Sequence, residues 1–227
     1  MTPGELIDQA LNPDIEDRDG LANDLLSEYF RGHPIESLKL LINSDLLSAQ
    51  STASFIVSEL GLRAAPLIRD VAKLLNHSTA RTRYDALETL WKCATYKDGW
   101  AIAAVLRCLE DPWHGVRSGA IDAIRLGDRK ALLSGFKHLK SEYPKTSYAA
   151  FGKAFLKAER GNNEVIQSLM NDEDPIARRF AVGLAARPRL VVDVSRLHLM
   201  QASKDAEITK YASNAESHVL PPWALLK

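Results

Sequence analysis

The chain has 227 residues, of which 46% are hydrophobic and 26% charged, and its 29 Lys and Arg balance its 29 Asp and Glu. This length suits one large domain or a repeat array with a continuous core. The composition argues against a membrane protein, because no window approaches the roughly 18 uninterrupted apolar residues that a membrane helix needs. The acidic N-terminal segment lacks the basic and apolar parts of a signal peptide, so we expect a cytoplasmic protein.

A polar turn residue recurs along the chain, followed six positions later by Arg and three further on by Ala. The pattern is clearest at Asp111, Arg117 and Ala120. Successive turns are 30 to 34 residues apart, a period typical of solenoids. Seven turns fit, some with substituted Arg or Ala: Asn12, Ser44, His77, Asp111, Ser141, Asp172 and Ser203.

Each period predicts two helices. The helix after the turn carries an apolar stripe, as in Phe151, Ala154, Phe155 and Ala158. A first helix precedes each turn, and Gly or Pro residues separate the units. No segment alternates as a β-strand does, so we expect an all-α fold. The clearest first helices cover residues 66–75, 100–109, 130–139, 163–170 and 191–200.

The recurring residues have physical roles in this scheme. A small Ala lets two helices cross closely. The turn Asn or Asp is expected to cap the second helix with its side-chain oxygen. The Arg is expected to bridge to an acid of the neighbouring unit and so set the angle between units.

The segments "DPWHGVRSGAIDAI" (111–124), "DPIARRFAVGLA" (174–185) and "ARTRYDALETL" (80–90) resemble HEAT repeats. The resemblance implies a right-handed α-solenoid of about seven helix-turn-helix units in a single domain over residues 1–220. Residues 221–227, which follow two prolines, are expected to cap the open end of the last unit. The units are expected near residues 3–32, 34–61, 64–95, 98–127, 128–160, 162–187 and 189–220.

Motifs for chemistry are missing from the sequence. None of the six histidines has nucleophile-elbow or metal-ligand spacing, and the glycines form no phosphate loop. Cys93 and Cys108 lack zinc spacing, and we expect buried thiols. We therefore expect no catalysis, no cofactor and no metal site.

Charge is unevenly distributed, and this predicts a first candidate surface. Residues 1–62 contain eleven acids and three bases, a formal charge of −8, so the remainder carries +8. Such a dipolar molecule can steer an oppositely charged partner. The candidate acidic residues at the N-terminal end are Asp14, Glu16, Asp17, Asp24 and Glu28.

A second candidate surface is a basic-aromatic ledge. Residues 129–160 hold eight Lys and Arg against two Glu. Aromatic residues recur at equivalent places in the second helices, where they either line an exposed edge or pack between units. Trp113, in a turn, is a further candidate for an exposed anchor. The ledge comprises Tyr84, Arg125, Tyr148, Lys153, Lys157, Arg179, Phe180, Lys210 and Tyr211.

Two functions follow. The first is a non-catalytic protein-binding scaffold, similar in size to small HEAT-like bacterial immunity proteins that occlude a cognate toxin. The alternative is a nucleic-acid-binding protein resembling the HEAT-like DNA alkylation-repair glycosylases, with the ledge tracking phosphates. The zero net charge counts against this alternative. A bilin-lyase-like role, suggested by the repeat class alone, has no further support.

Overall fold

The computed structural model describes residues 2–187 together with residues 200, 206, 208 and 209. This part of the chain contains helices and no strands, which confirms the predicted all-α fold. No helix in it is both long and apolar enough to cross a membrane. The unit expected at residues 189–220 falls almost entirely outside the described residues, and the tail at 221–227 wholly so.

The helices alternate between two layers. The first helices include short 3-10 segments, and Pro66 lies in one of them, so the helix expected at 66–75 is interrupted. First helices are α1 (Pro3–Ala10), α3 (Leu38–Ile42), α5 (Ile68–Val71), α7 (Gly99–Arg107), α9 (Arg129–Glu142) and α11 (Asn163–Met170). Second helices are α2 (Arg18–Phe30), α4 (Leu47–Leu60), α6 (Ala80–Cys93), α8 (His114–Leu126), α10 (Tyr148–Glu159) and α12 (Pro175–Ala185). The 3-10 segments are η1 (Ile35–Ser37), η2 (Gly61–Leu67), η3 (Ala72–Asn76) and η4 (Cys108–Glu110).

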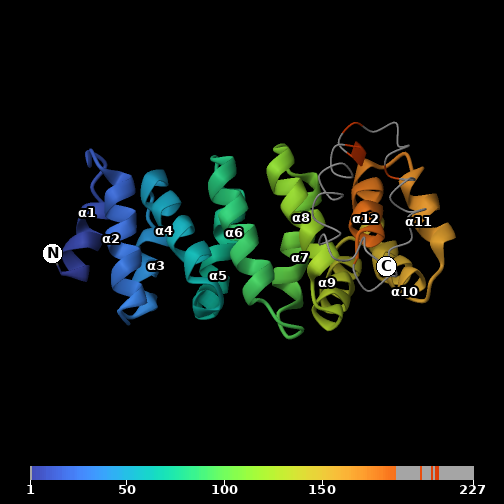
Figure 1. The fold of residues 1–227 in the computed structure, drawn as a ribbon, viewed down its shortest axis with the longest axis horizontal. Coiled ribbons are helices and arrows are strands. Elements are labelled where there is room, and N and C mark those ends of the chain that lie inside the picture. Colours follow the sequence, from blue (N-terminus) through green and yellow to red (C-terminus); the bar gives the residue numbers. More distant parts are fainter. Residues whose placement is uncertain (1, 188–199, 201–205, 207, 210–227) are drawn as a thin grey trace, which may run out of the picture.

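The second helices stack in chain order from α2 through α4 and α6 to α8. The order then changes, because α8 packs against α12 rather than against α10. Figure 1 shows α12 as the next helix of this row after α8, with α10 beyond the row on the side of α9. The array is therefore elongated, but its C-terminal part departs from a strictly regular stack.

The recurring Arg holds the turn of its own unit. Arg83, Arg117 and Arg178 each donate from Nη1 to the backbone carbonyls six and five residues earlier, at 2.7 to 3.0 Å. Gln50 takes the same role in a divergent unit, where its amide donates to the Ser44 carbonyl at 2.7 Å. The expected bridge to a neighbouring unit occurs at Arg83, which also binds both carboxylate oxygens of Asp111 at 2.7 and 2.9 Å.

The turn side chains do not cap the second helices as expected. Asp111 and Asp172 instead accept hydrogen bonds from the backbone N–H two residues on, at 2.8 and 2.9 Å. The helices begin later, and in α12 the capping residue is Asp174, which accepts from the Ile176 N–H at 2.9 Å. The turn residue lies too far before the helix to reach its free N–H groups, so that prediction is wrong for these two units.

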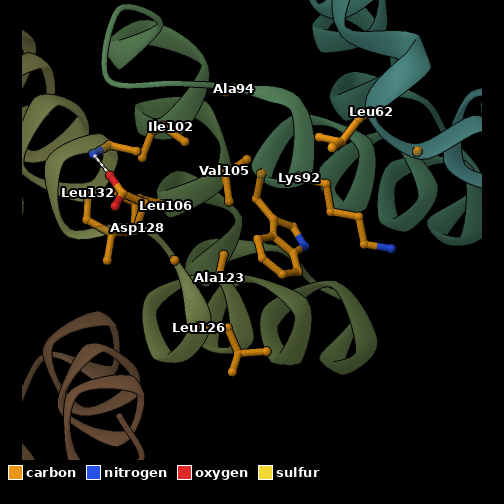
Figure 2. A pocket seen from close by; sticks show the side chains of 14 residues that line it. Leu62, Lys92, Ala94, Ile102, Val105, Leu106, Ala123, Leu126, Asp128 and Leu132 are labelled. Carbon is orange, nitrogen blue, oxygen red and sulfur yellow. Dashed lines mark hydrogen bonds between the residues drawn. The ribbon is translucent and has the colours of Figure 1, made fainter. Parts of the chain in front are cut away.

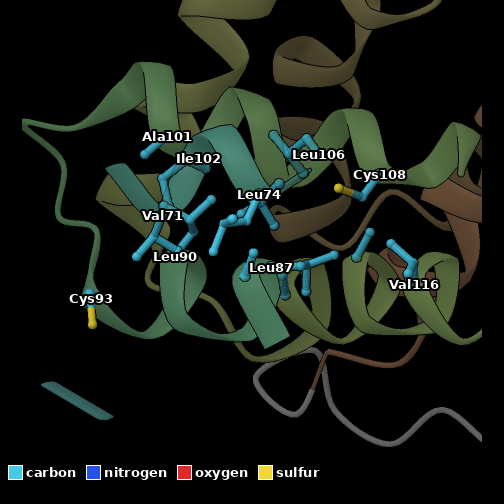
Figure 3. Close-up of a cluster of buried hydrophobic side chains, with 14 of the residues drawn as sticks. Val71, Leu74, Leu87, Leu90, Cys93, Ala101, Ile102, Leu106, Cys108 and Val116 are labelled. Carbon is cyan, nitrogen blue, oxygen red and sulfur yellow. The ribbon is translucent and has the colours of Figure 1, made fainter. Parts of the chain in front are cut away.

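The core runs continuously between the two layers. Figure 3 shows Val71, Leu74 and Leu106 from one layer meeting Leu87 and Leu90 from α6. Both cysteines are buried free thiols, as expected, and burial raises the pKa of Cys93 to about 11 and that of Cys108 to about 12. Thiols with such raised pKa values carry little thiolate at neutral pH and are unreactive.

Candidate partner-binding surfaces

The acidic surface lies at the N-terminal end of the array, on α2 and the loop before it. The candidate residues Asp14, Glu16, Asp17 and Asp24 are exposed, and they form no ion pair with any described residue. Asp17 also caps α2, since its carboxylate accepts from the Gly20 N–H at 2.8 Å. The remaining candidate, Glu28, pairs with Arg31, the residue that follows the end of α2.

The basic surface lies at the other end of the array, on α9, α10 and the loop that joins them (Figure 1). One pair there is internal, with Arg129 Nε 2.6 Å from Glu159 Oε2. The other Lys and Arg of this segment are exposed and form no ion pair within the described part of the chain. They are Lys130, Lys137, Lys140, Lys145, Lys153, Lys157 and Arg160.

The row of exposed aromatic residues is not formed. Tyr148 and Phe180 are only 3% and 0% exposed. These two aromatic residues therefore pack between units, the second of the two arrangements expected from the sequence. Phe180 stacks on Phe151 with ring centroids 3.9 Å apart. Tyr148 donates its hydroxyl hydrogen to Glu110, and burial raises the pKa of the phenol. These two residues therefore hold α10 and α12 in place and offer no surface to a partner.

The other ledge residues do not form one surface. Arg179 reaches inward and donates to the Leu109 carbonyl at 2.7 Å, and Arg125 pairs with Asp122 at 2.9 Å. Lys153 and Lys157 are exposed on α10. Lys210 and Tyr211 lie outside the described residues.

Tyr84 and Trp113 form a small aromatic cluster between the start of α6 and the start of α8. Their rings meet edge to face with centroids 6.4 Å apart, and Trp113 also contacts His114 at 5.4 Å. Gly115 makes room for the indole, because a Cβ atom there would overlap the ring. Trp113 remains 38% exposed, as expected for an anchor residue.

An apolar groove of about 420 Å³, not expected from the sequence, lies among η2, α6, α7, α8 and the start of α9. Figure 2 shows Leu62 and Leu126 on different sides of it, with Ile102, Leu106 and Leu132 together on a third side. Trp91 also lines the groove. The available sequence signal was weak: Leu62 and Leu126 each adjoin a glycine at a unit junction, where helical periodicity stops.

The described residues contain no group of three or more His, Cys, Asp or Glu arranged to hold a metal ion. Asp85 is the buried acid whose pKa rises furthest, to about 6, and the largest cause is desolvation. It lies at the contact of α4 and α6, away from the groove, and pairs with Arg81 at 2.8 Å.

Comparisons with known proteins address the class of fold. No protein-family model matches the sequence, and no curated protein matches it significantly. A designed armadillo repeat protein in complex with the peptide (KR)4 is similar, with a TM-score of 0.50, 13% identity, and 97% of this chain and 100% of that chain covered. A second designed armadillo repeat protein has a TM-score of 0.51, 13% identity, and coverage of 96% and 100%.

An archaeal HEAT-like repeats protein from Thermococcus onnurineus NA1 is also similar, with a TM-score of 0.49, 15% identity, and coverage of 97% and 99%. At these identities the likeness is one of fold alone. The protein is an all-α repeat solenoid, and the designed armadillo repeat proteins that share this fold span almost the same length.

Proposed function

We propose that this protein is a non-catalytic scaffold that binds a partner protein through the acidic surface at its N-terminal end. The observation that carries the proposal is the set of exposed carboxylates without an ion pair, Asp14, Glu16 and Asp24 among them. Carboxylates that are solvated in the free protein can pair with Lys and Arg of a partner. Complementary charge of this kind raises the association rate and selects the partner.

The partner that fits is a protein with a basic surface. A solenoid of the same fold class, the designed armadillo repeat protein, is in complex with a peptide of alternating Lys and Arg. That likeness supports a cationic partner for a solenoid with an acidic end.

The finer form of the proposal is an immunity protein that neutralises a toxin by occlusion. A nuclease active site is basic because it binds phosphates, so an acidic surface would cover it by imitating the charge of the substrate. Such a role requires no catalytic group in the inhibitor and places the protein in the cytoplasm with the toxin's target.

Affinity capture from a lysate of the source organism, with and without nuclease treatment, tests the proposal first. The expected result is one stoichiometric protein that is retained after nuclease treatment. Glu16→Lys combined with Asp24→Lys should weaken binding by about tenfold or more, because two attractive contacts become repulsive. The melting temperature should hardly change, since exposed substitutions of this kind alter stability by about 0.5 kcal/mol or less.

The matched control reverses charge at the other end of the array. Lys153→Glu combined with Lys157→Glu should leave partner binding within about twofold, because these exposed lysines lie on α10. The unpaired bases of α9 and α10 favour nucleic-acid binding as the second candidate function. Capture of nucleic acid alone, released at about 0.3 M salt and lost in this control, would replace the scaffold proposal with that one.

A further inference from the structure

We propose that the groove among α6, α7, α8 and α9 binds a peptide segment of the partner in which a large apolar side chain stands next to Lys or Arg. This inference rests on the proposed function in one respect, that the partner is a protein. It adds a second contact, remote from the acidic surface, and states the chemistry that this contact recognises.

The apolar part of the ligand follows from the lining of the groove. Leu62 is 73% exposed and Leu126 is 48% exposed, although both adjoin a concave apolar surface. The volume of about 420 Å³ falls within the range of about 300 to 1,000 Å³ typical of ligand sites. A leucine-sized side chain placed in the groove against Leu62, Leu126 and the Trp91 indole would remove apolar surface of both proteins from water.

The cationic part of the ligand follows from the helix ends that surround the groove. Three second helices end there: α4 before Gly61, α6 before Ala94 and α8 before Gly127. The end of α8 already binds Arg187, so the ends of α4 and α6 are the ones that a partner could meet. The last carbonyl groups of a helix have no partner within it, and the end of the helix carries partial negative charge. The carboxylate of Asp128 caps the start of α9, where it accepts from the backbone N–H groups of residues 130 and 131 and offsets the partial positive charge of that helix start.

The chain itself shows that a cation is accommodated at one of these ends. The Arg187 guanidinium is buried and donates to the carbonyls of Ile124 and Gly127 at the end of α8. The one Lys that lines the groove does not neutralise the site, because Lys92 Nζ lies 2.8 Å from the Glu88 carboxylate of its own helix. A Lys or Arg of the partner would meet the end of α6 as Arg187 meets the end of α8.

The test uses a labelled peptide, Gly-Ser-Leu-Lys-Leu-Lys-Ser-Gly, and two matched peptides in which Ser replaces both Leu or Glu replaces both Lys. Binding to the full chain is measured by fluorescence anisotropy. The Leu-Lys peptide should bind at least about tenfold more tightly than either matched peptide, a difference of about 1.4 kcal/mol. Equal binding of all three peptides would overturn the proposal.

Variants locate the binding. Leu62→Ser combined with Leu126→Ser should weaken binding of the Leu-Lys peptide by about tenfold, since two apolar contacts are lost. Leu40→Ser combined with Leu47→Ser is the matched control, because these leucines are also exposed but lie on α3 and at the start of α4. An equal loss in both double variants would overturn the proposal.

The groove and the acidic surface can fail separately. Peptide binding that depends on Leu62 and Leu126, with no protein captured from the lysate, would support the groove and reject the proposed function. A captured protein that depends on Glu16 and Asp24, with no preference for the Leu-Lys peptide, would support the function and reject the groove.

Discussion

Two contacts between second helices show how differently one repeat pattern can be packed. The contact of α4 with α6 is polar: Ser51 and Thr82 share a hydrogen bond of 2.9 Å, and Ser54 Oγ lies 3.5 Å from the buried Asp85 carboxylate. The contact of α8 with α12 is close and largely apolar. A Cβ atom added to Gly183 would lie 2.8 Å from Ile124, so the two helices meet at the glycine.

The comparison teaches that the contacts that stabilise the fold and the contacts that fix how helices align are distributed unevenly along the array. Burial of apolar surface is the main favourable term in folding, and it dominates where α12 packs against α8 and against α10. Buried polar groups restrict how helices align but add little net stability, because each hydrogen bond replaces one made with water. We therefore expect the C-terminal contacts to carry more stability for each helix than the contact of α4 with α6.

The largest expected effect is that of Phe180→Ala. Phe180 is fully buried, stacks on Phe151 and meets Phe136 edge to face with centroids 5.5 Å apart. Loss of the ring leaves a cavity at the junction of α9, α10 and α12, and should lower the free energy of unfolding by about 3–5 kcal/mol. Urea unfolding, monitored by circular dichroism, measures this loss in the free energy of unfolding.

The control for this prediction is Ser51→Ala at the polar contact, which should cost about 1 kcal/mol or less. If Ser51→Ala were as damaging as Phe180→Ala, the polar contact would be as important as the aromatic one and the comparison would fail.

A smaller effect is expected for Gly183→Ala. The added methyl group would press on Ile124, and the Ile121 carbonyl would be 3.2 Å away. Overpacking of this kind costs about 1–3 kcal/mol. It would exceed the gain of about 1 kcal/mol that Ala brings to a helix interior.

Gly152→Ala in α10 is the matched control for Gly183→Ala. Its Cβ atom would lie 3.3 Å from a side-chain atom of Phe136 and would meet no backbone, so a milder effect is expected. Differential scanning calorimetry of both variants measures the difference, and a higher melting temperature for Gly183→Ala would show that α8 and α12 are not in close contact.

The smallest effect concerns Asp85, and it depends on pH. Burial raises the pKa of this carboxyl from 3.8 to about 6 in the folded protein, so the folded state binds its proton more tightly than the unfolded state does. The protein should therefore lose stability as pH rises from about 4 to about 6 through this group, with no further loss above that. Asp85→Asn removes the buried charge and should stabilise the protein by about 1–2 kcal/mol at pH 7.5.

Urea unfolding at several pH values between 5 and 7.5 tests this prediction. The difference between Asp85→Asn and the unsubstituted protein should shrink as the pH falls below about 6. Glu88→Gln on the same helix is the control and should change stability by about 0.5 kcal/mol or less, because Glu88 is only partly buried and its ion pair with Lys92 is solvated. If Asp85→Asn raised the free energy of unfolding by the same amount at every pH, the raised pKa of Asp85 would be contradicted.

The acidic part of the candidate surfaces could be predicted from the sequence, whereas the aromatic part could not. Exposed acids such as Asp14 and Asp24 can be counted in the sequence, because charge that is not paired within a helix generally remains in water. Tyr148 and Phe180 were ambiguous, since an aromatic residue beside an apolar stripe can face either solvent or the next helix. Phe180 is buried by Phe136 and Phe151 from α9 and α10, and Tyr148 lies beside Glu110, contacts that no local pattern encodes.

The sequence by itself determined the helix pairs, the turns that join them and the apolar stripe of each helix, because these depend on contacts between residues close in the chain. It also determined the charge difference between the two ends. Only the tertiary structure decided that α12 follows α8 in the stack, that each recurring Arg binds the carbonyls of its own turn, and that a groove remains where three helices end. Periodicity shows which face of a helix must be covered, whereas the neighbour that covers it is set by how side chains distant in sequence fit together.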